Sequence, residues 1–146
     1  MQQVQKILFP IDFAANFETL APWVETYAAK FDATVHVLFV AQDLSHFASF
    51  YVPHGNIEEF QQQAIDSAKK RMAAAAQELS KKFPKLVTHV ELGAPAEKIL
   101  AFAQKENIDL IIMGVHGRTG LDRMIFGSVA NKVVKSASCP VLTVHP

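Results

Sequence analysis

The sequence predicts an α/β fold, in which a five-stranded parallel sheet carries helices on both faces. Five short runs are dominated by apolar residues, at 7–11, 34–41, 86–91, 109–113 and 141–144. Such runs are typical of strands that are buried on both faces of a parallel sheet. Between them, apolar side chains recur every three or four residues, which is the spacing of an amphipathic helix. The alternation of strand and helix favours a parallel sheet with right-handed crossovers.

The first strand is predicted to end just before Asp12. Pro10 has no backbone donor for a sheet ladder, so we expect it at the end of that strand. A helical stripe follows, made of Phe17, Leu20, Val24, Tyr27, Ala28 and Phe31. Pro22 is tolerated only in the first turn of a helix, so the helix either begins near Thr19 or kinks. Either Asn16 or Thr19 is expected to cap it.

The second strand, residues 34–41, is rich in β-branched and aromatic residues. Residues 42–56 are irregular, and their aromatic and histidine side chains could form a lid, a partner surface or a packed segment. A long amphipathic helix then runs from Ile57 to Phe83. The third strand, residues 86–91, is more mixed. His36 and His89 lie within predicted strands and are expected to be packed or solvated.

The C-terminal half supplies two further strands and two helices. Gly93 is expected in a turn, and Pro95 is expected at the first position of the next helix. Asn107 is a plausible end for that helix. The fourth strand, residues 109–113, is the most apolar run in this half of the chain. The last helix follows a glycine-punctuated segment, and residues 141–144 form the last strand.

Composition indicates a globular domain that spans residues 1–146. Half of the residues are hydrophobic, 19% are charged, and 14 basic residues balance 14 acidic ones. This balance gives no indication of a nucleic-acid footprint or of binding to an anionic membrane. No apolar run approaches the length of a membrane span or a signal peptide. The single cysteine, Cys139, fits a reducing compartment, so we expect a soluble cytoplasmic protein without a reactive thiol.

The segment after the fourth strand has the features of a phosphate site. Glycines allow the backbone to approach a ligand closely, and Ser128 is a favoured N-cap for the helix that follows. The start of a helix offers unpaired N–H donors and partial positive charge, which favour a bound anion. Arg118, Arg123 and Lys132 could add positive charge. An ordinary tight loop followed by a helix cap would show the same residues.

Two common phosphate motifs are absent. The chain contains no Gly-Lys pair, which the P-loop requires, and no Gly-x-Gly, which the dinucleotide fingerprint requires. The pattern present is Gly114-x2-Gly117-x9-Gly127-Ser128. It resembles the nucleotide-binding signature of the universal stress protein family, in its ATP-binding branch. The flanking stretches at 138–141 and at 10–12 also resemble that family, so the resemblance covers the whole chain. It implies the strand order 3-2-1-4-5.

The resemblance also implies which residues bind the nucleotide. They are Pro10, Ile11, Asp12, Phe39, Val40, Met113, Gly114, His116, Gly117, Arg118, Gly127, Ser128 and Val129. Asp12 would lie on the adenine or ribose side, although capping of the next helix is an alternative. Val40 would recognise the adenine edge through its backbone, and Ser128 could contact Mg²⁺. No other metal site is predicted. The family usually has a serine where this chain has Ala14, which removes a capping hydroxyl.

Three functions are compatible with these residues. The first is a regulatory protein of the stress response or of signalling that binds ATP or another adenine nucleotide. The second is a slow ATP hydrolase, but the sequence offers no evident base and no second carboxylate near the loop except Asp122. The third is a dimeric interaction module with an unused pocket. The resemblance further implies a homodimer through the last strand, formed by Val141, Leu142, Thr143 and Val144.

Overall fold

The computed structural model describes residues 1–13, 17–42, 57–115 and 127–145. Its centre is the parallel sheet that the sequence pattern predicts, with the strand order β3-β2-β1-β4-β5 that the family resemblance implies. The strands are β1 (Lys6–Pro10), β2 (Thr34–Gln42), β3 (Leu86–Gly93), β4 (Leu110–Gly114) and β5 (Val141–Val144). The helices in the described ranges are η1 (Phe17–Thr19), α1 (Ala21–Phe31), α3 (Ile57–Leu79), α4 (Pro95–Lys105) and α5 (Ser128–Ser136).

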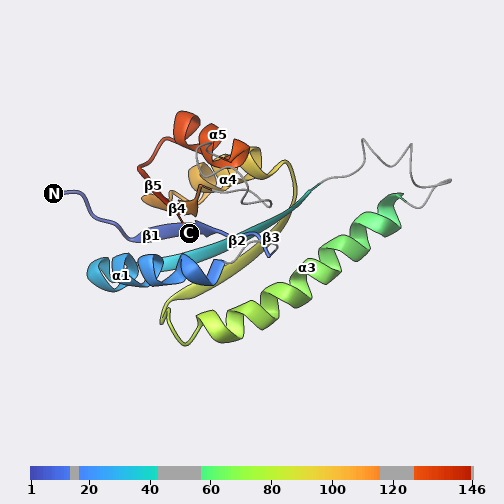
Figure 1. Cartoon of the computed structure of the whole chain (residues 1–146), viewed down its shortest axis with the longest axis horizontal. Coiled ribbons are helices and arrows are strands. Elements are labelled where there is room, and N and C mark those ends of the chain that lie inside the picture. Colours follow the sequence, from blue (N-terminus) through green and yellow to red (C-terminus); the bar gives the residue numbers. More distant parts are fainter. Residues whose placement is uncertain (14–16, 43–56, 116–126, 146) are drawn as a thin grey trace.

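The helices cover both faces of the sheet. Helices α1 and α3 lie on one face, and α4 and α5 lie on the other (Figure 1). Alternate residues of each central strand therefore enter different cores: Ile7 and Phe9 face α1, whereas Leu8 packs toward α4 and α5. All three of these side chains are fully buried. This double burial explains why the strands are near-continuous apolar runs in the sequence.

Two helix ends follow the sequence signals, but one predicted cap does not. Helix α1 begins after Thr19 with Pro22 in its first turn, so the proline causes no kink. The N-cap is Leu20, which makes no side-chain capping bond, so the prediction that Thr19 caps α1 is wrong. Asn16 lies outside the described residues. At the end of α4, Asn107 adopts φ 54°, and the Ile108 amide bonds to the Ala103 carbonyl at 2.9 Å, which forms a Schellman motif.

The strand order places a topological switch point at the middle of the sheet. Strand β1 pairs with β2 on one side and with β4 on the other, with Leu8 opposite His36 and Ile111. The chain leaves β1 toward α1 and leaves β4 toward α5, and these helices cover opposite faces (Figure 1). A crevice forms at the carboxyl ends of two such strands, which is where open α/β sheets bind ligands.

In the ranges that the structure describes, no helix is both long and apolar enough to cross a membrane.

Candidate nucleotide site

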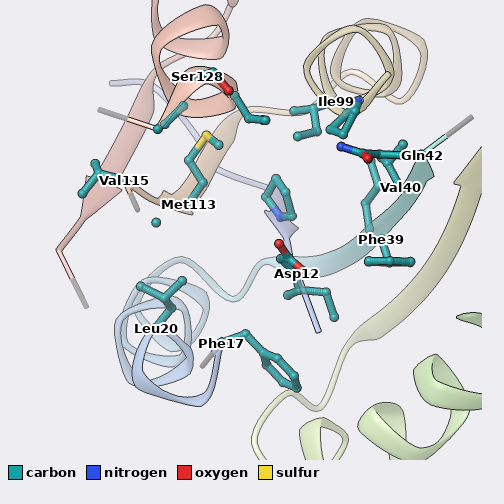
Figure 2. Close-up of a pocket in the computed structure, with 18 residues that line it drawn as sticks. Asp12, Phe17, Leu20, Phe39, Val40, Gln42, Ile99, Met113, Val115 and Ser128 are labelled. Carbon is teal, nitrogen blue, oxygen red and sulfur yellow. The ribbon is translucent and has the colours of Figure 1, made fainter. Parts of the chain in front are cut away.

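A cavity of about 370 Å³ opens at the switch point. It lies beyond the carboxyl ends of β1, β2 and β4 and is closed on further sides by the starts of α4 and α5 (Figure 2). Its described lining consists of Pro10, Ile11, Asp12, Phe17, Leu20, Leu38, Phe39, Val40, Gln42, Pro95, Ile99, Met113, Gly114, Val115, Gly127, Ser128, Val129 and Ala130. Such a volume suits a small organic ligand.

Ten of the thirteen residues predicted from the sequence line this one cavity. They are Pro10, Ile11, Asp12, Phe39, Val40, Met113, Gly114, Gly127, Ser128 and Val129. The other three, His116, Gly117 and Arg118, lie outside the described residues, as do Arg123 and residues 43–56. The structure therefore brings together residues from four separate parts of the chain. Their roles toward a ligand stay predictions.

Asp12 is held at the floor of the cavity by the strand that precedes it. The Ile11 amide donates a hydrogen bond to the Leu38 carbonyl at 2.9 Å, which extends the pairing with β2 beyond Pro10. Asp12 then stands between Met113 on one side and Phe39 and Val40 on the other (Figure 2). A carboxylate at this point can accept hydrogen bonds from ligand hydroxyl or N–H groups.

Gly114 ends β4 where the chain passes very close to α1. A Cβ atom at this position would lie 3.1 Å from Cδ1 of Leu20, which is tighter than an ordinary carbon contact. The absence of a side chain at Gly114 therefore allows the end of β4 to pass close to Leu20. Leu20 and Gly114 together form one wall of the cavity.

The start of α5 faces the cavity. The first helical bond runs from the Asn131 amide to the Gly127 carbonyl at 2.9 Å, and Gly127, not Ser128, is the N-cap. The predicted capping role of Ser128 is thus wrong by one position, because both residues of the Gly-Ser pair suit a helix start. Ser128, Val129 and Ala130 are the first helical residues, and their N–H groups have no partner within the helix. These donors, with the positive end of the helix dipole, favour an anion.

Aromatic side chains support the wall opposite α5. Phe17 and Phe39 line the cavity, and Phe13 packs against both, with ring centroids 6.3 Å and 4.5 Å away. The guanidinium of Arg71, from α3, stands 4.8 Å from the centroid of the Phe13 ring, within cation–π range. This contact connects the apolar wall of the cavity to α3.

Sequence reasoning missed the contribution of α4 and of several apolar neighbours. Pro95 and Ile99 line the cavity from the first turns of α4, and Gln42 lines it from the end of β2. Leu20, the N-cap residue of α1, adds a further apolar side chain to the lining. Gly93, which the sequence predicts in a turn, is instead the last residue of β3, and α4 begins two residues later at Pro95, as predicted. Only the packing of α4 over β2 shows that this junction reaches the site.

The described lining carries a single charged side chain, that of Asp12. Lys132, which the sequence suggested as an added positive charge, is outside this lining, and its ammonium lies 3.5 Å from the Glu97 carboxylate. Among residues 1–13, 17–42, 57–115 and 127–145, no cluster of three His, Cys, Asp or Glu side chains could hold a metal ion.

Burial raises the pKa of the Cys139 thiol, and the Asp109 carboxylate raises this pKa further.

The sequence profile of the universal stress protein family matches residues 3–145. The chain belongs to the universal stress protein family. Universal stress protein MJ0531 from Methanocaldococcus jannaschii is 37% identical over 145 residues, which cover 96% of this chain and 81% of the relative. Universal stress protein MJ0577 from the same organism is 30% identical over 152 residues, covering 96% and 94%.

Solved structures agree with this assignment. The structure of MJ0577 superposes with a TM-score of 0.83 at 30% identity and covers 99% of this chain and 98% of its own. Universal stress protein UspA from Lactobacillus plantarum gives a TM-score of 0.80 at 25% identity and covers 99% of both chains. A universal stress protein in complex with cAMP shares the fold at 19% identity, with 99% and 98% of the chains covered and a TM-score of 0.61. A universal stress protein from Archaeoglobus fulgidus in complex with dAMP shares it at 20% identity, with 97% and 98% covered and a TM-score of 0.69.

Proposed function

We propose that this universal stress protein binds an adenine nucleotide in the cavity at the switch point, with ATP as the first candidate. The observation that carries the proposal is the juxtaposition of an apolar recess, one carboxylate and a helix N-terminus around a single cavity. These three features match the three parts of a nucleotide: base, ribose and phosphates. We place the protein in the ATP-binding branch of its family on the same ground.

The base is expected between the aromatic and aliphatic walls. Phe39 and Val40, near the end of β2, and Ile99, from α4, provide apolar surface in the cavity. Backbone groups at the end of β2 lie beside this recess and can bond to the edge of a planar base. Asp12, between the two sides, is placed to accept hydrogen bonds from the ribose hydroxyls.

The phosphates are expected at the start of α5. Gly127, Ser128 and Val129 line this end of the cavity, and the N–H groups of Ser128 and Val129 belong to the first helical turn. Positive charge from Arg118 and Arg123 is a further expectation, and both residues lie outside the described ranges. If Mg²⁺ accompanies the phosphates, it would supply charge neutralisation, and the Ser128 hydroxyl, at the start of α5, is the candidate protein oxygen for it.

The relatives make adenine nucleotides the natural ligands to test. Two universal stress proteins with the same fold were solved with cAMP and dAMP. Both ligands carry adenine on a phosphorylated sugar, while their phosphate groups differ. Each ligand has a single phosphate, a cyclic diester in cAMP and a monoester in dAMP, so we infer that recognition of adenine is the common element and that the form of the phosphate is the variable one.

Binding is better supported than hydrolysis. Phosphoryl transfer needs metal ligands, a group that positions water and a cation on the developing charge. The described lining supplies only one carboxylate, that of Asp12, and no cationic side chain. We therefore propose a ligand-binding role in stress response or signalling, with any turnover slow.

We also propose that the protein forms a homodimer through β5. This strand is one edge of the sheet, and Leu142 is half-buried rather than covered. An apolar strand edge favours pairing with another strand, and pairing with its own copy gives a twofold-symmetric dimer.

Native mass spectrometry of the purified protein, followed by titration calorimetry, tests the ligand. We expect one adenine nucleotide per chain, either carried through purification or taken up from added ATP, ADP or AMP. Adenosine should bind more weakly than AMP, because it lacks the phosphate that meets α5. A protein that binds none of these while remaining folded would overturn the proposal.

A further inference from the structure

Two histidines meet beneath α4, outside the nucleotide site. His36 lies on β2 and His89 on β3, and Nδ1 of His36 is 3.1 Å from Nε2 of His89. His36 is only 7% exposed, and His89 is half-buried. Strand register explains the meeting, because His89 stands opposite Leu38, two residues beyond His36 on the same face of the sheet.

The bond between the two rings is in line. The ring centroids are 5.4 Å apart, and the planes differ by 17°. The distance between the centroids is longer than the 3.1 Å between the two nitrogens by about the width of one imidazole ring. That difference equals two centroid-to-nitrogen distances laid end to end, so both nitrogens lie close to the line between the centroids. The two lone-pair directions point at each other rather than at a common metal position. One proton therefore sits between the rings, donated by one and accepted by the other.

The pair is the surface on which Phe102 of α4 rests. The Phe102 ring is 5% exposed and makes edge contacts with both imidazoles, at centroid distances of 5.9 Å to His36 and 4.6 Å to His89. Ile99, one turn earlier on the buried face of α4, lines the nucleotide cavity together with Pro95. The position of α4 over the histidine pair thus sets one wall of that cavity.

Charged groups surround the pair unevenly. Burial, then His89, then Lys6 on β1 lower the pKa of His36, and the Lys6 ammonium bonds to the Glu106 carbonyl at 2.9 Å. The Glu106 and Glu91 carboxylates act in the opposite direction, Glu106 on both rings and Glu91 on His89. Burial is the largest influence on each ring, and it lowers the pKa of both His36 and His89.

We propose that His36, His89 and Phe102 form a pH-sensitive support for α4, which holds the helix against the nucleotide cavity near neutral pH and releases it in acid. One added proton leaves a charged pair in a largely apolar recess. A second added proton puts two N–H donors face to face and breaks the bond between the rings. The coupling to ligand affinity rests on the proposed nucleotide site, whereas the support itself does not.

The test compares the wild-type protein with His89→Gln and His145→Gln. Glutamine at 89 keeps a side-chain N–H near His36 but does not titrate in this range. His145 is exposed and lies outside the pair, so His145→Gln controls for the loss of a histidine. Two readings are taken at about pH 7.5 and about pH 5.5: hydrogen exchange of α4 amides, corrected for intrinsic rates, and the Kd for AMP.

In the wild type and in His145→Gln, we expect the protection of α4 amides against exchange to fall at least about tenfold in acid. In His89→Gln, the same protection should fall much less. Acid also changes the ionisation of the AMP phosphate, and this effect on the Kd is the same for both proteins. Beyond it, the acid-induced rise in the Kd for AMP should be at least about threefold larger in the wild type than in His89→Gln. Equal acid responses in the wild type and in His89→Gln would overturn the proposal.

Nitrogen NMR of the wild-type rings provides a test that needs no variant. Both rings should stay neutral below the pKa of an ordinary histidine and then gain protons as α4 loses protection. Rings that titrate without any change in α4 would overturn the proposal. If AMP binds at neither pH, the proposed nucleotide function fails, while the exchange data still decide whether the histidine support exists.

Discussion

The Gly127 amide donates a hydrogen bond to the Val115 carbonyl, so two residues twelve positions apart in the chain meet beside the cavity. The Val115 amide in turn bonds to the Val144 carbonyl at 3.2 Å, which ties this junction to β5. Val115 and Gly127 are therefore held together next to the end of β5. Of the signature glycines, Gly127 makes this bond and Gly114 directly precedes Val115, although the two glycines are far apart in sequence.

Replacing Gly127 with valine should weaken nucleotide binding at least about tenfold, or about 1.4 kcal/mol. The backbone at Gly127 has φ −52° and ψ 146°, which any residue can adopt, so no backbone strain is expected. The loss would come from a branched side chain at the proposed phosphate end. Calorimetry with ATP measures it, and Ser136→Val, at the exposed far end of α5, is the matched control. Unchanged affinity in folded Gly127→Val would remove this residue from the site.

Replacing Gly114 with alanine should destabilise the fold by about 1–3 kcal/mol through overpacking against Leu20. The added methyl group would stand 3.1 Å from Cδ1 of Leu20, and the side chain of Leu20 would have to move. Chemical denaturation measures the free energy of unfolding. In a double-mutant cycle with Leu20→Ala, the destabilisation of the double variant should be smaller than the sum for the two single variants by at least about 0.5 kcal/mol. Additive effects would contradict the contact.

Local sequence patterns predicted much of the fold. The central strands were recognisable because burial on both faces makes them near-continuously apolar, as in Leu110–Gly114. Asn107 was recognisable as a helix end because asparagine tolerates the left-handed conformation it adopts. The strand order was not readable from periodicity, since pairing is non-local, and it came from the family resemblance.

The site was predictable only in part, for the same physical reason. Asp12 and Gly127 could be chosen because they follow a strand and open a helix, which are local signals. Ile99 carries no local sign of its role, which depends on how α4 crosses β2. The His36–His89 bond was equally invisible, because it depends on the register between β2 and β3.

Acid should destabilise the folded protein through the histidine pair. Burial lowers the pKa of His36 and His89 below the ordinary value of 6.5, so the unfolded chain binds more protons just below that pH. Their contribution to stability is complete above about pH 6.5 and is lost as the pH falls through the lower pKa values of the folded state. Urea denaturation across this range measures the slope. His36→Leu combined with His89→Leu should flatten it, and a slope that persists in this variant would assign the effect to other groups.

Replacing Leu142 with lysine should convert the proposed homodimer into a folded monomer. The substitution places a charge in the middle of edge strand β5, and charged residues on an edge oppose strand pairing between copies. Sedimentation velocity measures the assembly, and circular dichroism checks that the sheet survives. The other edge of the sheet offers a matched control: Val87 lies on β3 and is 41% exposed. Val87→Lys should leave the dimer intact, whereas dissociation by Val87→Lys with no effect of Leu142→Lys would move the interface to β3.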